Sequence, residues 1–421
     1  MTRPSFLTGT LPRRLLALGA AAGLALTLLP AAPAQAATSQ TVKGTFFGMH
    51  DGDPTSWPAA PVGDIRLWDS FVNWRQLETA NGVFDFSRLD AQVAAARANG
   101  SRVLLVLGQT PRFHSTKPRK GGSYGLGAAS MPTQASWTNY VYKVVNRYKG
   151  RGVDYQVWNE ANVSGYWNGT PAQMAKLTQW TSRIVNNNDS SALVVAPALA
   201  TRLTGQRAWL RIFYAQRTGG KKVAAYVDAV SLNLYPLPKQ TPEDSMQLLA
   251  ASREMLSRAG VSKPIWNTEI NYGLLGGGTA NNITRAKEAS YVARTLVLNA
   301  ENNVKRMFWY AWDLQNLANT QLTYTNGTSL TQAGTAYKVV RTWLLNSRTK
   351  GCVRDGKGTY TCTLAYSGGV KRVYWNPSRK VTVRAVKSAR ASVGLYGVEK
   401  PLSGGEAIGV GMAPVMVRSA K

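Results

Sequence analysis

An α/β fold is predicted for this chain: a (β/α)8 TIM barrel followed by a small C-terminal antiparallel β-sandwich. The barrel is indicated by strand-like and helix-like segments that alternate over roughly 300 residues. The sandwich is indicated by a change near residue 349, where helical periodicity stops and short alternating runs separated by turns begin. A chain of 421 residues is long enough to bury the cores of one large and one small domain.

The barrel strands are expected at eight short apolar or aromatic runs. The third run is continuously apolar, as in strands that are buried on both faces of a sheet. The eight runs are residues 45–49, 64–68, 103–107, 155–158, 193–195, 227–232, 264–267 and 306–310.

Helices are expected between these strands, and several have recognisable ends. Ser87 is the N-cap of an alanine-rich helix that follows the second strand. Thr241 and Pro242 open another helix with a cap, a proline and an acidic first turn, and Gly260 closes it. The crossover at residues 51–62 is too short for a full helix, so one outer helix is expected to be missing or degenerate. The remaining helices are expected to include residues 137–145, 170–171, 209–214, 286–299 and 336–345.

The C-terminal region contains the only two cysteines, Cys352 and Cys362, which lie ten residues apart. In an exported chain, this spacing predicts a local disulfide that clips a hairpin. A metal site would need more ligands than these cysteines and the only two histidines, His50 and His114, provide. Neither a metal nor another cofactor is therefore expected. The sandwich strands are expected at residues 359–363, 370–375, 381–386, 392–396 and 413–417.

The N-terminus has the features of a cleaved export signal rather than a membrane span. Arg13 and Arg14 precede a short apolar stretch at residues 15–29, and Ala34-Gln35-Ala36 offers a cleavage site. No later segment is long and apolar enough to cross a bilayer, so the protein is expected to be secreted. The expected organisation is a signal peptide at residues 1–36, a catalytic barrel at 37–348 and a β-sandwich domain at 349–421.

The chain is strongly basic, with a formal net charge of +29. The signal carries three arginines and no acidic residue, so the mature chain keeps +29 less three, or +26. A polyanionic partner, such as an acidic polysaccharide or a cell envelope, would explain this excess. General surface chemistry with no specific partner is a second explanation. Nucleic acid is a third, but the basic residues are scattered and no nucleic-acid-binding motif is present.

Two stretches end in a carboxylate where an expected barrel strand ends. Glu160 stands in the stretch VWNEAN after the fourth strand, and Glu269 ends the stretch PIWNTE of the seventh. The carboxyl ends of barrel strands meet at the face where barrel enzymes place their active sites. A pair of carboxylates is what glycosidic bond cleavage needs, because one protonates the leaving oxygen and the other attacks the sugar or activates water.

Trp158-Asn159-Glu160 resembles the strand-four acid/base motif of the retaining glycoside hydrolases of clan A, and Glu269 resembles their strand-seven nucleophile. The resemblance covers nearly the whole mature chain. Within the clan, the overall pattern of the sequence is most similar to glycoside hydrolase family 39. It implies that Glu160 is the general acid/base, that Glu269 is the nucleophile and that Asn159 hydrogen-bonds the sugar 2-OH. The alternative is that both carboxylates form ordinary salt bridges at the barrel mouth.

The same resemblance assigns two residues near the nucleophile. Tyr235, after the sixth strand, matches a tyrosine that hydrogen-bonds the nucleophile, and Arg66, late in the second strand, matches an arginine beside it. Both would hold the pKa of the nucleophile low. The alternatives are core packing for Tyr235 and an interior ion pair for Arg66. Relatives often carry histidine where this chain has Asn233, which leaves the contacts of that subsite open.

Aromatic residues and histidines near the strand ends are further candidates for substrate contacts. Of Trp309 and Trp312 in the eighth strand, we expect Trp312 to be a sugar-stacking platform and the other to lie in the core. Four more residues are each either substrate contacts or packed loop residues. They are His50 and Asp51 after the first strand, His114 after the third, and Trp167, with its neighbour Tyr166, after the fourth.

These features together predict a secreted retaining glycosidase that acts by double displacement on a poly- or oligosaccharide, with an acidic or cell-envelope glycan as one candidate. A retaining mechanism needs the two carboxyl groups about 5–5.5 Å apart. The competing interpretation is a non-catalytic glycan-binding or envelope-associated barrel, which would keep the aromatic platforms but would not need both carboxylates. A nucleic-acid binder that uses the basic surface is the third class.

Overall fold

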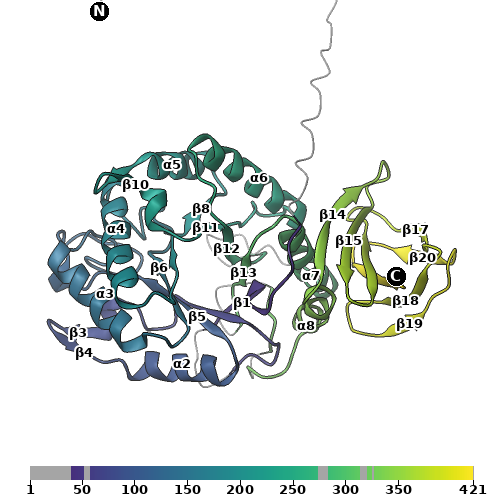
Figure 1. Cartoon of the computed structure of the whole chain (residues 1–421), viewed down its shortest axis with the longest axis horizontal. Coiled ribbons are helices and arrows are strands. Elements are labelled where there is room, and N and C mark those ends of the chain that lie inside the picture. The colour runs from purple at the N-terminus through teal and green to yellow at the C-terminus, as the bar shows by residue number, and fades with distance from the viewer. Residues whose placement is uncertain (1–38, 52–56, 274–282, 313–319, 325–326, 421) are drawn as a thin grey trace, which may run out of the picture. The chain divides into compact units, whose positions relative to one another are not determined.

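The computed structural model describes residues 39–51, 57–273, 283–312, 320–324 and 327–420 (Figure 1). These residues belong to one compact unit that spans residues 36–421. The predicted signal peptide lies outside the described residues. Within the described part of the chain, no helix is long and apolar enough to span a membrane.

A curved parallel sheet forms the centre of the larger domain, and helices surround it (Figure 1). Neighbouring strands follow the order β7-β6-β5-β2-β1-β13-β12-β11-β8. All eight strand positions predicted for the barrel are occupied. The strands are β1 (Phe47–His50), β2 (Asp64–Leu67), β5 (Arg102–Leu107), β6 (Val153–Val157), β7 (Val194–Val195), β8 (Leu199–Ala200), β11 (Val230–Asn233), β12 (Ile265–Ile270) and β13 (Arg306–Trp309).

The sheet closes through its fifth strand, which is split into β7 and β8. β7 pairs with β6 on one side, and β8 pairs with β11 on the other. A parallel bridge between Val195 and Ala229, with Ala196 N donating to Ala229 O at 3.0 Å, joins β7 to the start of β11. Pro197 stands between the two halves, and a proline has no N–H to donate to the ladder. The predicted (β/α)8 fold is therefore confirmed, with one interrupted strand.

Several outer helices begin where capping residues predict, but the N-cap predicted at Ser87 is wrong: Ser87 is the first residue of α2, Phe86 is at the N-cap position, and Ser87 N donates to Asp85 Oδ1 at 2.9 Å. Thr170 Oγ1 accepts a hydrogen bond from Gln173 N at 3.2 Å, while Gln173 Oε1 accepts one from Thr170 N at 2.8 Å, which completes a capping box for α4. The described part of the first crossover, residues 57–63, contains no helix, as expected from its length. The helices are α1 (Trp74–Leu77), α2 (Ser87–Ala98), α3 (Gln134–Tyr148), α4 (Pro171–Asn188), α5 (Thr204–Ala215), α6 (Pro242–Arg258), α7 (Arg285–Glu301) and α8 (Gln332–Leu344).

Short elements complete the loops between these helices and strands. Three are 3-10 turns, η1 (Gly44–Phe46), η2 (Arg112–His114) and η3 (Val223–Tyr226). Four are short strands in two hairpins, β3 (Glu78–Ala80) with β4 (Val83–Phe84), and β9 (Arg217–Thr218) with β10 (Lys221–Lys222).

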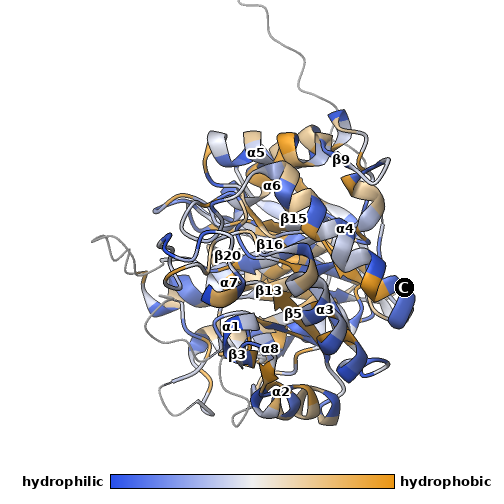
Figure 2. Cartoon of the chain, turned by 90° about the vertical axis from the view of Figure 1, so that its left-hand side faces the viewer, coloured by the Kyte–Doolittle hydropathy of each residue, from blue (hydrophilic) through white to orange (hydrophobic). Residues whose placement is uncertain are grey.

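The core is built from the apolar strands and from one face of each outer helix. Figure 2 shows that helices such as α2 and α4 carry both hydrophilic and hydrophobic stretches, as helices with one buried face do. Large aromatic side chains fill the space between helices and sheet: Trp74 stacks on Tyr140 with ring centroids 4.6 Å apart. Residues 103–107 are all buried, which confirms the two-sided burial predicted for the third strand.

A cluster of charges closes the barrel at the N-terminal ends of its strands. Arg306, at the start of β13, contacts Asp64 at the start of β2, and its Nη1 lies 2.8 Å from Asp154 Oδ2 in β6. Its guanidinium also lies 3.9 Å from the ring centroid of Trp266. Burial raises the pKa of Asp64 to about 7, and Arg306 opposes this shift. The interior is thus filled at this end, which leaves the opposite end for a site.

The C-terminal region consists of antiparallel strands, as predicted. A six-stranded sheet has the order β14-β15-β16-β21-β18-β19, and β17 pairs with β20 in a separate pair. The strands are β14 (Arg348–Arg354), β15 (Tyr360–Tyr366), β16 (Gly369–Trp375), β17 (Val381–Arg384), β18 (Ala389–Val393), β19 (Glu399–Pro401), β20 (Ala407–Val410) and β21 (Val415–Ser419).

The predicted disulfide is present in the first hairpin of this region. Cys352 in β14 and Cys362 in β15 are paired directly across the two strands, with Cα atoms 4.0 Å apart. The bond therefore clips the hairpin, as its sequence spacing predicts.

Polar contacts link the C-terminal strands to the outer helices of the barrel. Trp375 Nε1 donates to Glu243 Oε1 at 2.8 Å, and Gly351 N donates to Glu301 Oε2 at 2.7 Å. Glu301, at the end of α7, is buried, and its other carboxylate oxygen has no hydrogen-bond partner among the described residues. Burial raises the pKa of Glu301 from 4.5 to about 7, against the lowering effect of the backbone amides of Gly351 and Lys350.

We expect Glu301→Gln to stabilise the protein above pH 7. The folded-state pKa of Glu301 is raised, so its contribution to stability is fully present below pH 4.5 and is lost as the pH rises through about 7. The neutral amide removes this loss, and the free energy of unfolding above pH 7 should rise by roughly 1–3 kcal/mol. Urea unfolding across this pH range measures it. Glu254→Gln, at an exposed carboxylate, is the control, and an equal gain at pH 4 in Glu301→Gln would contradict the explanation.

Candidate active site

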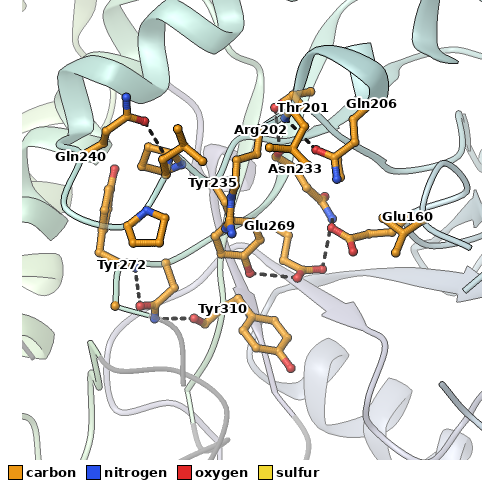
Figure 3. Close-up of a pocket in the computed structure, with 18 of the residues that line it drawn as sticks. Glu160, Thr201, Arg202, Gln206, Asn233, Tyr235, Gln240, Glu269, Tyr272 and Tyr310 are labelled. Carbon is orange, nitrogen blue, oxygen red and sulfur yellow. Dashed lines mark hydrogen bonds between the residues drawn. The ribbon is translucent and has the colours of Figure 1, made fainter. Parts of the chain in front are cut away.

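A cavity of about 770 Å³ opens at the C-terminal ends of the barrel strands. Glu160 and Glu269 both line it, together with Asn159, Asn233 and Tyr235. Figure 3 shows Glu160, Asn233, Tyr235 and Glu269 converging on this space from different strands. The structure thus brings together the two carboxylates that are far apart in the sequence.

Glu160 is presented by a sharp turn just after β6. Trp158 and Glu160 have φ values of 71° and 43°, in the left-handed region that non-glycine residues rarely adopt. Backbone hydrogen bonds hold this turn on both sides: Trp158 N donates to Leu107 O at 2.8 Å, and Ala161 N donates to Ala198 O at 3.1 Å. Neighbouring strands therefore maintain a strained backbone at the position that carries the carboxylate.

Glu269 lies within β12 and is positioned by a shift in strand register. Leu232 pairs with Asn267, but the next residue, Asn233, pairs with Glu269. An irregularity of this kind inserts an extra residue on one strand and re-aims the side chains beside it. The shift places Asn233 directly beside the carboxylate of Glu269.

Arg66 connects the strands around the two carboxylates. It is fully buried, and its Nη1 lies 2.9 Å from Glu269 Oε2. Its Nε donates to Gln156 Oε1 at 2.7 Å, and its Nη2 donates to Asn159 Oδ1 at 2.7 Å. Nη1 also lies 2.8 Å from His50 Nε2, which must accept because a guanidinium can only donate. Burial, followed by the charge of Arg66, lowers the pKa of His50, so this histidine is neutral.

Asn233 bridges the two carboxylates. Its Nδ2 lies 3.2 Å from Glu160 Oε1 and 3.5 Å from Glu269 Oε2. Its Oδ1 accepts a hydrogen bond from Thr268 Oγ1 at 2.9 Å. Since that oxygen is occupied, the amide nitrogen is turned toward the carboxylates. The residue that departs from the pattern of the resembled family is therefore part of the site.

A chain of hydrogen bonds behind Asn233 fixes this orientation. Gln156 Nε2 donates to Ser231 Oγ at 2.5 Å, and Ser231 Oγ lies 2.5 Å from Thr268 Oγ1. Thr268 donates its proton to Asn233, so Ser231 must donate to Thr268. Gln156 Oε1 in turn accepts a hydrogen bond from Arg66 Nε. One continuous network thus runs from Arg66 to the amide between the carboxylates.

The two carboxylates have different hydrogen-bond donors. Glu269 accepts hydrogen bonds from the Arg66 guanidinium on Oε2 and from the Tyr235 hydroxyl on Oε1, the latter at 2.8 Å. Among the described residues, Glu160 accepts a hydrogen bond only from the amide of Asn233. Burial raises the pKa of Glu269 to about 7, with Arg66 opposing and Glu160 adding to the shift. Burial also raises the pKa of Glu160, against the hydrogen bond from Asn233.

The two groups share one cavity, so they titrate as a pair. Strong donors favour the ionised form of a carboxylate, and Glu269 has the stronger ones. We infer that when the pair holds one proton, this proton is on Glu160. The arrangement can therefore supply one acid and one ionised nucleophile at the same time.

The structure places the other predicted site residues at different distances from the cavity. Asn159 and Tyr235 line it, whereas Arg66 and His50 lie behind the wall and act through their contacts with each other and with Glu269. Asp51 is buried, and its backbone oxygen accepts a hydrogen bond from Ser70 at 3.0 Å. Asp51 is not among the residues that line the cavity.

Three aromatic candidates lie away from the cavity wall. Trp312 is fully buried and donates from Nε1 to Gly327 O at 3.1 Å, so its indole presents no exposed face to a sugar. His114 lies 2.9 Å from Glu78 and stacks on Trp74, away from the carboxylates. Trp167 is also buried, packs edge-on against Trp158 at 4.9 Å and borders a separate, shallow pocket. Burial removes the two tryptophans from the wall, whereas the contacts with Glu78 and Trp74 hold His114 away from it.

Several residues of the cavity wall were not predicted. They include Asn233, Asp69, Tyr124, Tyr310 and Arg202, whose guanidinium lies 5.7 Å from the ring centroid of Tyr235. Asp69 and Asn233 both lie at strand ends, so the rule that found Glu160 could have found them. Tyr124 comes from a long loop and gave no signal in the sequence.

Among the residues that the structure describes, three cations and three carboxylates line the cavity. The cations are Arg202, Lys239 and Lys287, and the carboxylates are Asp69, Glu160 and Glu269. Within the described ranges, no group of three or more His, Cys, Asp or Glu side chains is arranged to hold a metal ion. The chemistry that this site can perform with its own groups is proton transfer and nucleophilic attack by carboxylates.

Comparison with known proteins agrees with this geometry. Residues 133–337 match the family model of the glycosyl hydrolase catalytic core. No curated protein sequence matches the chain.

Solved structures with the same fold cover nearly the whole chain. A family 39 glycoside hydrolase from the gut symbiont Bacteroides cellulosilyticus WH2 is 18% identical, with a TM-score of 0.68 over 91% of this chain and 82% of its own. A family 39 β-xylosidase from Caulobacter crescentus is 17% identical, with a TM-score of 0.65 over 92% and 98%. A family 30 endoxylanase from Clostridium papyrosolvens C71 is 13% identical, with a TM-score of 0.60 over 91% and 97%.

At these identities the solved structures show the fold, and the family model supplies the activity class. The match spans Glu160, Asn233, Tyr235 and Glu269. The predicted resemblance to glycoside hydrolases and the prediction of a glycosidase are therefore confirmed, and the fold is shared with glycoside hydrolases of families 39 and 30.

We expect Asn233→Ala to lower kcat/KM and to move the alkaline limb of its pH profile to higher pH. The hydrogen bond from Asn233 lowers the pKa of Glu160, so its loss raises that pKa and keeps the acid protonated longer. Loss of a hydrogen bond to a charged group predicts a decrease of about 10- to 100-fold. The pH dependence of hydrolysis of an aryl glycoside measures both effects.

Asn162→Ala is the matched control for this prediction. Asn162 lies in the same loop as Glu160, and its amide nitrogen donates to the backbone oxygens of Ala200 and Gln206. An unchanged pH profile in Asn233→Ala, or an equal shift in Asn162→Ala, would show that Asn233 has no special role.

Proposed function

We propose that this protein is an exported retaining glycoside hydrolase that cleaves O-glycosidic bonds of a poly- or oligosaccharide by double displacement. One observation carries the proposal. The half-buried Glu160 and the buried Glu269 share the amide of Asn233 at one cavity, and among the described contacts Glu269 alone also receives Arg66 and Tyr235.

In the first step, Glu269 attacks the anomeric carbon while Glu160 gives its proton to the leaving oxygen. The glycosidic C–O bond breaks as the bond between the sugar and Glu269 forms. Arg66 and Tyr235 favour the ionised form of Glu269 before the attack, although they do not hold its pKa low as expected, because burial raises it to about 7. In the second step, Glu160 takes a proton from water, the water oxygen attacks the anomeric carbon, and Glu269 leaves with its negative charge.

The spacing of the carboxylates supports retention. Glu160 Oε1 and Glu269 Oε2 lie 3.2 and 3.5 Å from Asn233 Nδ2. The distance between these two oxygens is therefore no greater than the sum of the two contact distances. Retaining glycosidases hold their carboxyl groups about 5–5.5 Å apart, while inverting enzymes leave about 6.5–9.5 Å for a water molecule. The shared amide is consistent with the shorter class.

Asn159 is suited to hold the sugar in the reacting position. Its Oδ1 accepts from Arg66 Nη2 at 2.7 Å, so its amide nitrogen is the group left to face the cavity that it lines. A neutral donor at this place can bind a sugar hydroxyl without changing the charge of the site.

The substrate is a carbohydrate, and two kinds are proposed for testing. Two of the relatives with the same fold are named as a β-xylosidase and an endoxylanase, which makes neutral β-xylosides candidates. The net charge of +29 makes an acidic or cell-envelope glycan the other candidate. Among the described Lys and Arg residues, three line the cavity, so most of this charge would act elsewhere on the molecule.

The test is hydrolysis of aryl glycosides and of neutral and acidic polysaccharides by wild type, Glu269→Ala and Glu160→Ala. We expect wild type to turn over at least one substrate and both variants to lose about 10³-fold or more in kcat. Azide should rescue Glu269→Ala and yield a glycosyl azide of inverted configuration. Glu254→Ala, at an exposed carboxylate, is the control. Equal glycan binding by all variants with no turnover would favour a non-catalytic glycan-binding barrel.

Export predicts a defined mature N-terminus. Expressed in a secreting bacterial host, the chain should appear outside the cytoplasm with residues 1–36 removed and Ala37 first. N-terminal sequencing of the secreted protein measures this. Replacement of Ala34 and Ala36 by bulky residues should block processing, whereas a cytoplasmic, full-length wild-type product would contradict export.

A further inference from the structure

Asp69 is a third carboxylate on the cavity wall, and the double displacement described above does not use it. It follows β2 by two residues and has a φ of 43°, so its backbone turns sharply at the strand end. It lines the same cavity as Glu160 and Glu269. A strained backbone that presents a carboxylate to an active-site cavity calls for a functional explanation.

Two phenols hold the carboxylate of Asp69. The Tyr124 hydroxyl donates to Oδ1 at 2.5 Å, and the Tyr310 hydroxyl donates to Oδ2 at 2.9 Å. Trp68 Nε1 donates to the Tyr124 oxygen at 2.8 Å, so the single proton of Tyr124 is left for Asp69. Each carboxylate oxygen therefore has one phenol donor and keeps capacity to accept a second hydrogen bond from the cavity.

Asp69 is linked through Tyr310 to the wall that carries the nucleophile, because Tyr310 follows β13, the strand next to β12 with Glu269. Arg202 follows β8 on the other side of β12, lies over Tyr235, and its charge opposes the rise in the pKa of Glu160. The negative charge of Asp69 also acts on both catalytic groups, because it contributes to raising the pKa of Glu160 and of Glu269.

The cation nearest this wall is already occupied. Arg66 contacts Glu269, Asn159, Gln156 and His50, which use its guanidinium nitrogens. A sugar that carries its own carboxylate here would meet the negative charges of Asp69 and Glu269 without a free counter-ion from Arg66. A neutral sugar would meet a fixed acceptor for one of its hydroxyls.

We propose that Asp69 accepts a hydrogen bond from a hydroxyl of the sugar in the reacting position and makes that position selective for neutral sugars over uronic acids. The inference rests on the proposed glycosidase activity and adds the substrate class of the reacting position. Acidic sugars in a mixed glycan would then occupy flanking positions, where the cavity wall carries Lys239 and Lys287.

The test uses pairs of substrates that differ only by a carboxylate. The pairs are the para-nitrophenyl glucoside and glucuronide, and the galactoside and galacturonide, in both anomeric forms. Wild type should prefer the neutral member of each pair that it accepts. In Asp69→Asn, kcat/KM for the neutral member should fall about 10- to 100-fold, as for loss of a hydrogen bond to a charged group, while the uronide should not fall. The neutral-to-uronide ratio should therefore shrink by at least about tenfold.

Two further variants separate charge from fold. Tyr124→Phe removes one phenol but keeps the negative charge, so it should lower activity while the preference against uronides stays. Glu254→Gln makes the same charge change at an exposed surface site and should leave the ratio unchanged. An equal loss on both members of a pair in Asp69→Asn, or a wild-type preference for the uronide, would overturn the inference.

Failure of the proposed activity is distinguishable from failure of this inference. If wild type hydrolyses none of the aryl glycosides, the inference is tested by calorimetry with D-glucose, D-xylose and D-glucuronate. Tighter binding of a neutral sugar than of glucuronate in wild type, with the difference lost in Asp69→Asn, would support it. The absence of such a difference in wild type would overturn it.

Discussion

The buried guanidinium of Arg66 is the interaction on which the site depends. A buried charge is unfavourable unless it is paired and hydrogen-bonded, and Arg66 satisfies this need through Glu269, Asn159, Gln156 and His50. These partners come from three strands of the barrel, β1, β6 and β12, or from their ends. One side chain therefore ties the strand ends together and supplies the positive charge that favours an ionised Glu269.

The asymmetry between the two carboxylates follows from that one contact and from the network behind it. Glu269 receives the guanidinium directly, whereas the hydrogen-bond donor to Glu160 within the described residues is the amide of Asn233. The other end of the barrel uses the same ion-pair chemistry, with Arg306 and Asp64, for a different purpose. There the charges fill the interior, whereas at the C-terminal end a cavity of about 770 Å³ gives a substrate access to them.

Local patterns predicted most of the architecture because each depends on residues close in sequence. Apolar runs and capping residues located the eight strands and the outer helices, and cysteine spacing located the disulfide. The split of the fifth strand at Pro197 could also have been predicted, because a proline has no N–H to donate to the hydrogen-bond ladder of a sheet. The expectation that Trp312 forms a sugar-stacking platform was wrong, because this tryptophan is buried. Its burial could not be predicted from the sequence, since it depends on the packing of distant segments.

The sequence by itself determined the barrel, the strand-end positions of Glu160 and Glu269, and the presence of Arg66 near them. Strand periodicity and position at a strand end are local properties, so they can be recognised in the sequence without a structure. Only the tertiary structure decided that Asn233 bridges both carboxylates and that Tyr124 and Tyr310 hold Asp69. Those contacts join residues far apart in the chain, and a register shift and the closure of the ring bring them within hydrogen-bond distance.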